Sequence, residues 1–352
     1  MSSRPVNLLS VYKTVRPRRP SPHTLKDMAV KNGQAMVTDL DVYAVVPTDL
    51  PDGVYRQVGP NLERYPDEAG RSLDDMPSVP ILESAAVGDP IVFPREEFKA
   101  LLNFVVDNPA RPLWGAICFR IGPDRTMELI ATDQCALCRH VVHAPAGLPE
   151  GEYIVPAKAI RTLLLDKNAE GITMSVSGNH MSLETGHLSV IVRLTDGKYY
   201  ATDNVMPKRL ESVYVLGTKE LRKAVKTLAP YLDPETKSVR IRDAEDAINV
   251  ITGSGSLELS AKNAYENLEK TLFVDSKRRP GGVITTGNLM LVMPLSPSNN
   301  QPNGSRLLQY RYLKQVVDSV SGPHLYMGLQ GSLSDVLATV FSPEPLCGGE
   351  LA

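Results

Sequence analysis

A Cys-x-x-Cys pair followed closely by two histidines is the combination of residues in this chain that comes nearest to metal chemistry. The four residues are Cys135, Cys138, His140 and His143. A structural zinc site needs four ligands in a recognisable spacing, and no second cysteine pair stands near the first. The two histidines lie in a strand-like run, which favours buried or half-buried strand side chains. We therefore predict no bound metal and no cofactor.

Sequence motifs for catalysis are also missing. No phosphate-binding loop, nucleophile elbow or metalloprotease motif occurs, and the carboxylates of Asp74 and Asp75 fall in a loop with no partner base. We predict that the chain is not an enzyme. A Cys/His metal enzyme on an unrelated α+β fold is the remaining enzymatic alternative, and metal analysis of the purified protein would test it.

Basic residues gather on two predicted helices, 156–168 and 218–229. Together the helices carry seven basic residues against two acidic ones, a local charge of +5 in a chain whose formal net charge is −2. A basic helical face can contact the phosphates of a duplex without reading its sequence. The candidate DNA-contacting residues are Lys158, Arg161, Lys219, Arg222, Lys223 and Lys226, with Arg16, Arg18 and Arg19 near the N-terminus and Arg111 in a loop. The alternative is that these are solvated helix faces, as runs of charge usually are.

The elements that must position these residues are mostly strands. Alternating or β-branched runs predict strands at 115–121, 127–132, 172–177, 188–195, 239–243 and 247–252. Apolar residues at helical spacing predict short helices at 94–107, 156–166, 218–229 and 309–320. Helices of about three turns among many strands indicate an α+β fold.

Composition is that of a soluble protein with a full core, since 42% of the residues are hydrophobic and 22% charged. A length of 352 residues suggests two or three domains. No apolar run approaches the roughly 18 residues of a membrane helix, and the N-terminus lacks a signal-peptide core. Four cysteines make no disulfide scaffold, which favours a reducing cytoplasm.

A weak internal repeat organises the strands. Residues 28–46, 117–142 and 239–262 share a strand, a polar turn, a second strand, a corner and a third strand. The corners are Thr38-Asp39, Thr132-Asp133 and Thr252-Gly253. The repeat predicts three copies of one domain, at 1–88, 89–209 and 210–352, of which the first is short. Chance similarity between β-meanders is the alternative.

The middle copy carries a family resemblance. ELIATDQCALCRHVVHAP, then EYIVPAKAIRTLL, then SVIVRLTDGKYYATDNVMPK resemble the middle domain of the bacterial DNA polymerase sliding clamp, the β clamp. The positions that match in order are Thr132, Asp133, Leu137, Val155, Pro156, Lys158, Asp196, Gly197, Tyr199 and Val205. Residues 28–42 and 74–80 resemble parts of the first clamp domain, and 307–340 resemble the last helix and strands of the third.

The resemblance implies three related domains, with strands outside and the helices 156–166 and 218–229 lining a channel. It implies a processivity factor that encircles duplex DNA and tethers DNA polymerase, the clamp loader or other clamp-binding proteins. The clamps are head-to-tail homodimers, so the resemblance implies a homodimer. It also implies a location in the cytoplasm, on the nucleoid, where the DNA is. The first domain is short and 47–75 is rich in Pro, Gly and Asp, so we expect a dimer interface smaller than the family's.

The resemblance also implies an apolar cleft that takes a short peptide motif from partner proteins. Its matches are Leu113, Thr132, Leu137, Val205, Tyr312 and Leu333, while Gln134 and Tyr200 stand where the family pattern differs. Each apolar residue taken alone is more often ordinary core. The main functional alternative is a clamp homologue that no longer closes on DNA and acts as an adaptor, or as a competitor of a host clamp.

Overall fold

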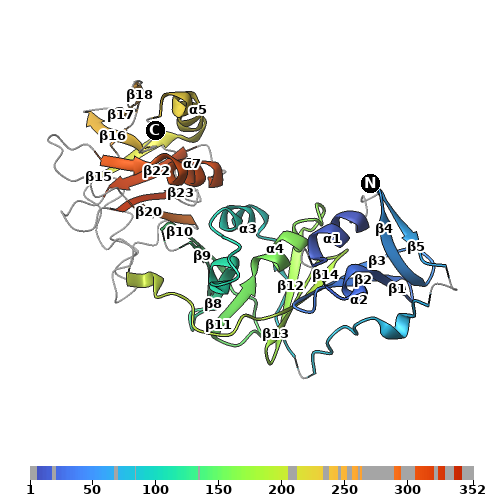
Figure 1. Ribbon diagram of the computed structural model, residues 1–352. Coiled ribbons are helices and arrows are strands. Elements are labelled where there is room, and N and C mark those ends of the chain that lie inside the picture. The colour runs from blue at the N-terminus through green and yellow to red at the C-terminus, as the bar shows by residue number, and fades with distance from the viewer. Residues whose placement is uncertain are drawn as a thin grey trace. The chain divides into compact units, whose positions relative to one another are not determined.

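The computed structural model describes residues 6–17, 21–66, 70–83, 85–133, 135–204, 212–232, 238–244, 247–251, 256–260, 262–263, 289–294, 306–320, 324–329 and 337–342 (Figure 1). The chain divides into two compact units. Unit 1 comprises Met1–Phe98, Asp107–Glu128 and His143–Tyr199, and unit 2 comprises Lys99–Val106, Leu129–Val142 and Tyr200–Ala352.

Unit 1 contains a 10-stranded sheet in the order β5-β4-β1-β2-β3-β14-β13-β12-β6, with β7 also pairing with β12. The paired strands are antiparallel. The strands are β1 (Met28–Lys31), β2 (Gln34–Thr38), β3 (Val42–Pro47), β4 (Gly53–Val58), β5 (Asn61–Arg64), β6 (Ala86–Val87), β7 (Ile91–Val92), β12 (Gly171–Ser177), β13 (His180–Glu184) and β14 (Ser189–Arg193).

Two packed helices cover strands of unit 1. Helix α1 (Leu8–Val15) contacts β2 and β3, and helix α4 (Ala157–Leu163) contacts α1, β3, β14 and the strands β8 (Ala116–Ile121) and β11 (Gly151–Pro156). Helix α1 buries Val11, Tyr12 and Val15. Helix α4 buries Ala157, Ala159, Ile160, Thr162 and Leu163. These apolar faces contribute to the core of the unit, together with buried strand residues such as Met28 and Val190.

A second sheet of unit 1 pairs β11 with β8. A sheet of unit 2 has the order β10-β20-β23-β22-β15-β19, in which β10 is Leu137–His143, and β9 (Thr126–Thr132) pairs with β10. Unit 2 holds the rest: β20 (Leu289–Pro294), β23 (Leu337–Ser342), β22 (His324–Leu329), β15 (Ser212–Gly217) and β19 (Lys262–Asn263). It also holds a 4-stranded sheet of β18 (Ser256–Ser260), β17 (Ala247–Ile251), β16 (Ser238–Ala244) and β21 (Arg306–Gln309).

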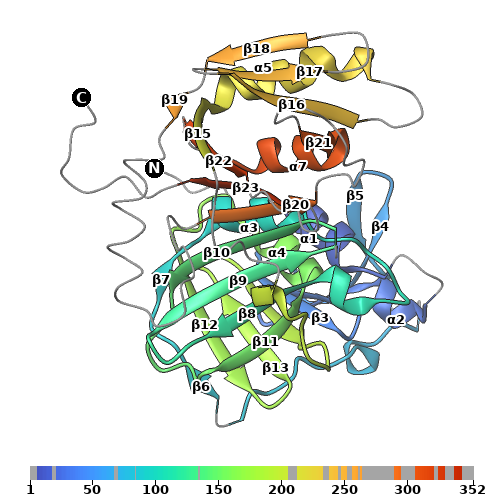
Figure 2. The ribbon, with the colours of Figure 1, turned by 90° about the vertical axis from the view of Figure 1, so that its left-hand side faces the viewer.

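Unit 2 also carries a packed helix pair. Helix α5 (Thr218–Leu228) contacts α7 (Tyr310–Ser319), β15 and β18, and α7 contacts β20 and β21, so each helix touches both sheets (Figure 2). Helix α5 buries Leu221, Ala224 and Val225, and α7 buries Leu313 and Val316 among others. Each unit thus places two helices against two sheets.

The predicted strands and helices all have counterparts, with shifts of a few residues at their ends. Helix α3 (Arg95–Leu102) is shorter than the predicted 94–107, because the amides of Asn103 and Phe104 donate to carbonyls three residues back. Phe104, which the predicted apolar face omitted, is fully buried, whereas Val105 is half-buried. The α+β class is therefore confirmed. The domain boundaries 1–88, 89–209 and 210–352 stay a prediction.

Helix α1 is an element that the sequence analysis missed. The side chain of Asn7 caps it by accepting from the Ser10 amide at 3.0 Å. Asparagine is a favoured N-cap residue, and the apolar Val11, Tyr12 and Val15 that follow it share one face of the helix.

A search of the described helices for a membrane-spanning segment finds none of sufficient length and hydropathy.

The repeated Thr-Asp corners share one turn geometry. Asp39 Oδ1 accepts from the amides of Asp41 at 3.2 Å and Val42 at 2.9 Å. Asp133 Oδ1 accepts from the amides of Cys135 at 2.9 Å and Ala136 at 2.8 Å. Aspartate is favoured here because its side chain closes the turn between two strands. The third corner, Thr252-Gly253, lies outside the described residues.

Candidate nucleic-acid and peptide-binding residues

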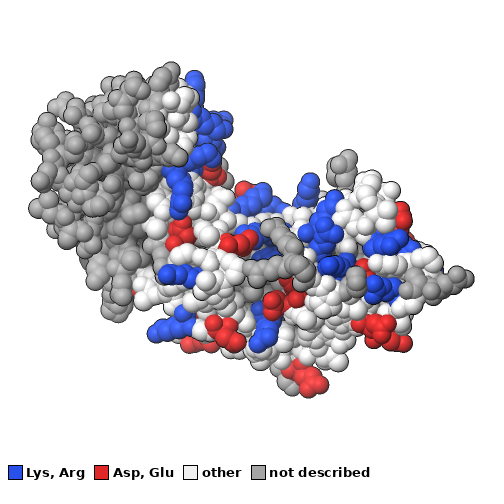
Figure 3. Space-filling view, viewed as in Figure 1, with Lys and Arg blue, Asp and Glu red and all other residues white. Residues whose placement is uncertain are grey.

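Helix α5 presents lysines on the face opposite its buried residues. Lys219, Lys223 and Lys226 are exposed, and none of them has an ion-pair partner within the described part of the chain. Figure 3 shows basic side chains over this helix. Long exposed cations on one helical face are suited to phosphate contacts that do not depend on base sequence.

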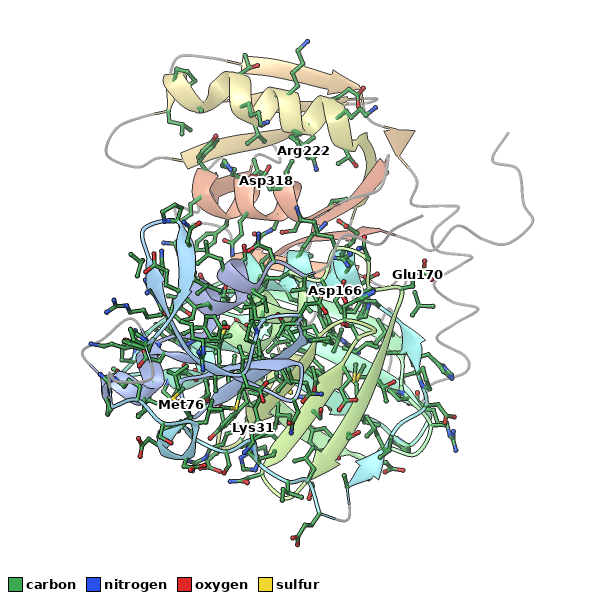
Figure 4. All side chains as sticks on the ribbon, turned by 90° about the vertical axis from the view of Figure 1, so that its right-hand side faces the viewer. Lys31, Met76, Asp166, Glu170, Arg222 and Asp318 are labelled. Carbon is green, nitrogen blue, oxygen red and sulfur yellow. The ribbon has the colours of Figure 1, made fainter. Side chains whose placement is uncertain are left out.

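Arg222 on the same helix differs from these lysines. Its Nη2 donates to the carbonyls of Val317 at 3.0 Å and Val320 at 2.8 Å, at the end of α7. Its Nε lies 3.9 Å from Asp318 Oδ1. Figure 4 labels Arg222 and Asp318 on the two neighbouring helices. A cation at a helix C-terminus satisfies carbonyls that lack helical partners, so this geometry gives Arg222 a role in joining α5 to α7.

The two candidate cations of α4 are both paired with carboxylates. Lys158 Nζ forms an ion pair with Asp39 Oδ2. Arg161 Nη1 lies 3.1 Å from Asp107 Oδ1 and 3.2 Å from Asp107 Oδ2. Both cations are half-buried. The positive charge that the sequence places on this helix is therefore compensated locally.

The remaining described cations of the predicted DNA surface stack on aromatic rings. The guanidinium of Arg16, at the end of α1, lies 5.2 Å from the centre of the Tyr12 ring. That of Arg111 lies 4.6 Å from the centre of the Trp114 ring. These distances allow cation–π attraction, which holds both heads near the protein surface. Arg18 and Arg19 lie outside the described residues.

Three of the predicted peptide-contacting residues lie around the Thr132-Asp133 corner. Thr132 is buried and its Oγ1 donates to the Ala136 carbonyl at 2.8 Å. Leu137 is buried at the start of β10, where it pairs in register with Val292 of β20. Tyr312, near the start of α7, comes from far along the chain to the same corner, as the interactions of its hydroxyl show.

The Tyr312 hydroxyl lies in a polar cluster at that corner. Burial, helped by the nearby Cys135 and Asp133, raises the pKa of Tyr312 to about 12. Arg311 Nη2 lies 3.0 Å from the Tyr312 hydroxyl and 3.3 Å from Asp133 Oδ2. A buried ring with its hydroxyl held in a polar network gives an apolar wall with a fixed polar edge. Such a wall suits the capture of one large peptide side chain.

Of the five other residues predicted to contact the peptide, only two lie in the described part of the chain. Leu113 and Tyr200 are half-buried. Gln134, Val205 and Leu333 lie outside the described residues. The joint use of all eight residues as one site stays a prediction.

The residues of the Cys/His combination differ in exposure, since His140 is buried and His143 is exposed. Cys138 is buried, and burial raises the pKa of its thiol well above the ordinary value. Cys135 is exposed. In the described part of the chain, no group of three or more His, Cys, Asp or Glu side chains is placed to hold a metal ion.

Sequence reasoning overlooked the carboxylates that surround the basic residues. Asp39, Asp107 and Asp318 each face a candidate DNA cation. It also overlooked Arg311, which binds the corner of the second repeat. The repeated Thr-Asp corner was the available signal for Asp39 and Asp133. No sequence pattern links Asp107 to Arg161, because the pair depends on the fold.

Comparison with known proteins places this fold. No family model matches the chain. The beta sliding clamp of Halalkalibacterium halodurans is 26% identical over 202 residues, which are 54% of this chain and 50% of that protein. The beta sliding clamp of Pseudomonas putida is 27% identical over 201 residues, 52% of this chain and 51% of the other. The matched stretch thus spans about half the length of these curated relatives.

Solved structures match over nearly the whole chain. The DNA polymerase III beta subunit from Thermotoga maritima has a TM-score of 0.66 at 12% identity, covering 96% of each chain. A sliding clamp from Pseudomonas aeruginosa bound to griselimycin has a TM-score of 0.64 at 16% identity, covering 96% of this chain and 97% of that one. The fold is thus the α+β fold of the β clamps. The chain is thus similar, in about half of its sequence and in its fold, to the beta sliding clamps of the DNA polymerase III beta family.

Proposed function

We propose that this protein is a sliding-clamp-like processivity factor. It encircles duplex DNA without sequence specificity and tethers DNA polymerase and other replication or repair proteins through an apolar peptide site. The observation that carries the proposal is the match to clamp structures over 96% of the chain. The beta sliding clamps are non-enzymatic processivity factors, so the protein binds and tethers without catalysing a reaction.

The proposed arrangement has three related domains in each subunit, strands outside, and helices lining a channel. Two subunits join head to tail, and the protein works in the cytoplasm on the nucleoid. The exposed lysines of α5 support the DNA-binding part of this proposal, because Lys219, Lys223 and Lys226 face solvent while Leu221, Ala224 and Val225 of the same helix are buried.

The peptide-tethering part is supported by the corner of the second repeat. Thr132 and Leu137 lie on either side of the corner, and the Tyr312 hydroxyl reaches the same corner from α7. Clamp loaders, polymerases and other proteins that carry a clamp-binding motif are the partners that this site would take.

The DNA-binding part is tested with a triple variant of α5, in which Lys219, Lys223 and Lys226 are replaced by alanine. Binding to a fluorescent duplex is measured by anisotropy over a series of salt concentrations. If each lysine contacts one phosphate, the slope of log K against log salt should fall in magnitude by about 2.7. These side chains are exposed, so the folded structure should persist, which circular dichroism would check.

A control variant removes two lysines elsewhere. Lys31 and Lys198 are also exposed (Lys31 is labelled in Figure 4), and their replacement by alanine should leave the slope close to that of the wild type. An α5 variant with an unchanged slope would contradict the assignment of this helix to the DNA surface.

An adaptor that does not close on DNA is the second candidate function. The observation that favours it is the local compensation of charge on α4, where Lys158 and Arg161 both face carboxylates. Such a protein would bind the peptide motif of clamp partners and show little affinity for duplex DNA. The salt series above separates the two functions directly.

A further inference from the structure

Two carboxylates of unit 1 form ion pairs with cations that would contact DNA in a clamp. We propose that Asp39 and Asp107 compete with DNA phosphate for Lys158 and Arg161, respectively. Their ion pairs with these cations lower the affinity of unit 1 for the duplex. The inference rests on the proposed function of the same surface. It adds two acidic residues that reduce affinity for DNA.

The first pair is built into the fold. Asp39 Oδ1 accepts from the amides of Asp41 and Val42, while Asp39 Oδ2 is directed to Lys158. Asparagine has the same oxygen and would close this turn equally well. The turn therefore needs the carbonyl-like oxygen but not the negative charge. The charge is left for Lys158.

The second repeat has the same arrangement. Asp133 Oδ1 accepts from the amides of Cys135 and Ala136, and Asp133 Oδ2 lies 3.3 Å from Arg311 Nη2. In both corners one oxygen closes the turn and the other pairs with a cation on a helix. A contact that recurs in two copies of one motif is a property of the motif rather than an accident of one surface.

The second pair is more open to solvent. Asp107 has a side chain that is 62% exposed, and that of Arg161 is 34% exposed. An exposed pair contributes little to stability, yet its two charges cancel toward a distant phosphate. A phosphate that approaches Arg161 must therefore displace the carboxylate or share the guanidinium with it.

Charge cancellation has a defined consequence for salt dependence. A cation already paired with a carboxylate adds little to the net number of ions released when DNA binds. Removing the carboxylate charge should restore that contribution. Each restored contact should raise the magnitude of the salt slope by about 0.9, and the combined Asp39→Asn and Asp107→Asn variant should raise it by about 1.8.

The test is anisotropy of a fluorescent duplex with the full chain, over a series of salt concentrations. For each substituted aspartate, the ratio of variant to wild-type affinity should grow by about 3.5-fold as salt falls from about 200 mM to about 50 mM. Asp107→Glu keeps the charge at the second, more exposed pair and should keep the wild-type slope. Adding Lys158→Ala to Asp39→Asn removes both charges of the pair and should return the slope to that of the wild type.

The control separates local from global charge. Asp74 and Asp75 are exposed carboxylates on a short helical turn of unit 1, and replacing both with asparagine changes the net charge equally. This control should leave the slope unchanged. An equal rise in the control, or no rise in the Asp39 and Asp107 variants, would overturn the inference while wild-type binding still supports the clamp function. No duplex binding by the wild type or any variant would contradict the proposed function itself.

Discussion

Single aspartates at the strand corners connect the repeat to the candidate sites. In Asp39 and in Asp133, one carboxylate oxygen accepts hydrogen bonds from turn amides, and the other forms an ion pair with a cation. The Thr-Asp pattern is thus explained by turn chemistry. The second oxygen of the aspartate pairs with Lys158 in unit 1 and with Arg311 in unit 2. The same corner in unit 2 supports Tyr312, the residue on which the peptide-site prediction depends.

Tyr312→Ala should weaken peptide binding. The ring is an aromatic side chain that reaches the corner, and truncating such an anchor costs roughly 2 kcal/mol or more, a loss of about 30-fold in affinity. Calorimetry with a synthetic clamp-binding peptide measures this loss. DNA binding should stay the same, because the substitution removes no charge.

Tyr153→Ala is the matched control for that prediction. Tyr153 is a half-buried tyrosine of β11, and its hydroxyl donates to the Pro149 carbonyl at 3.0 Å. Its loss should leave peptide affinity near that of the wild type. Equal loss in the two variants would point to general destabilisation, and no measurable peptide binding by the wild type would contradict the peptide site.

At the scale of elements, α5 combines two roles on its two sides. Arg222 holds the end of α7 through the carbonyls of Val317 and Val320, whereas Lys223, the next residue, is exposed. Arg222→Ala should therefore lower the free energy of unfolding by about 2 kcal/mol, because it removes charge-assisted hydrogen bonds at a helix end. Urea unfolding measures this change.

Lys223→Ala is the contrasting variant. Its free energy of unfolding should stay within about 0.5 kcal/mol of the wild type, as usual for an exposed position. Its DNA affinity should fall, and should fall more than that of Arg222→Ala. The reverse pattern would show that Arg222 faces DNA and that its contacts with α7 are incidental.

The extent of the elements was largely predictable from the sequence. The alternation of 172–177 and the helical spacing of 218–229 gave β12 and α5 to within a residue or so. Helix α3 ended early because its backbone tightens after Leu102, although apolar spacing continues to the buried Phe104. Helix α1 was not predicted because its eight residues span only about two turns, too short for a clear apolar period, and the Asn7 cap was its main signal.

The ion pairs could not be predicted in the same way. Asp107 and Arg161 are separated by 54 positions and Lys158 and Asp39 by 119. Helical periodicity places a cation on a face, but only the packed neighbours decide what that face meets. The sequence therefore indicated a basic α4 surface, and the fold supplied its compensating carboxylates.

At the scale of the whole molecule, the repeat and the resemblance identified the fold better than any single motif. Sequence similarity to curated clamps covers about half of their length, yet the structural match covers nearly all of the chain. A pattern of strands and short helices persists when few residues are shared, because many apolar sequences fill the same core. Residue roles do not persist to the same degree.

The central claim is that the protein encircles duplex DNA. Its most direct test is to incubate the protein with linear duplex, seal the DNA into a circle with ligase, and wash at high salt. A parallel sample is sealed before protein is added. The account predicts that protein stays on circles sealed after loading, that one restriction cut releases it, and that much less stays on circles sealed first. Equal retention in both orders, or no retention in either, would contradict encirclement.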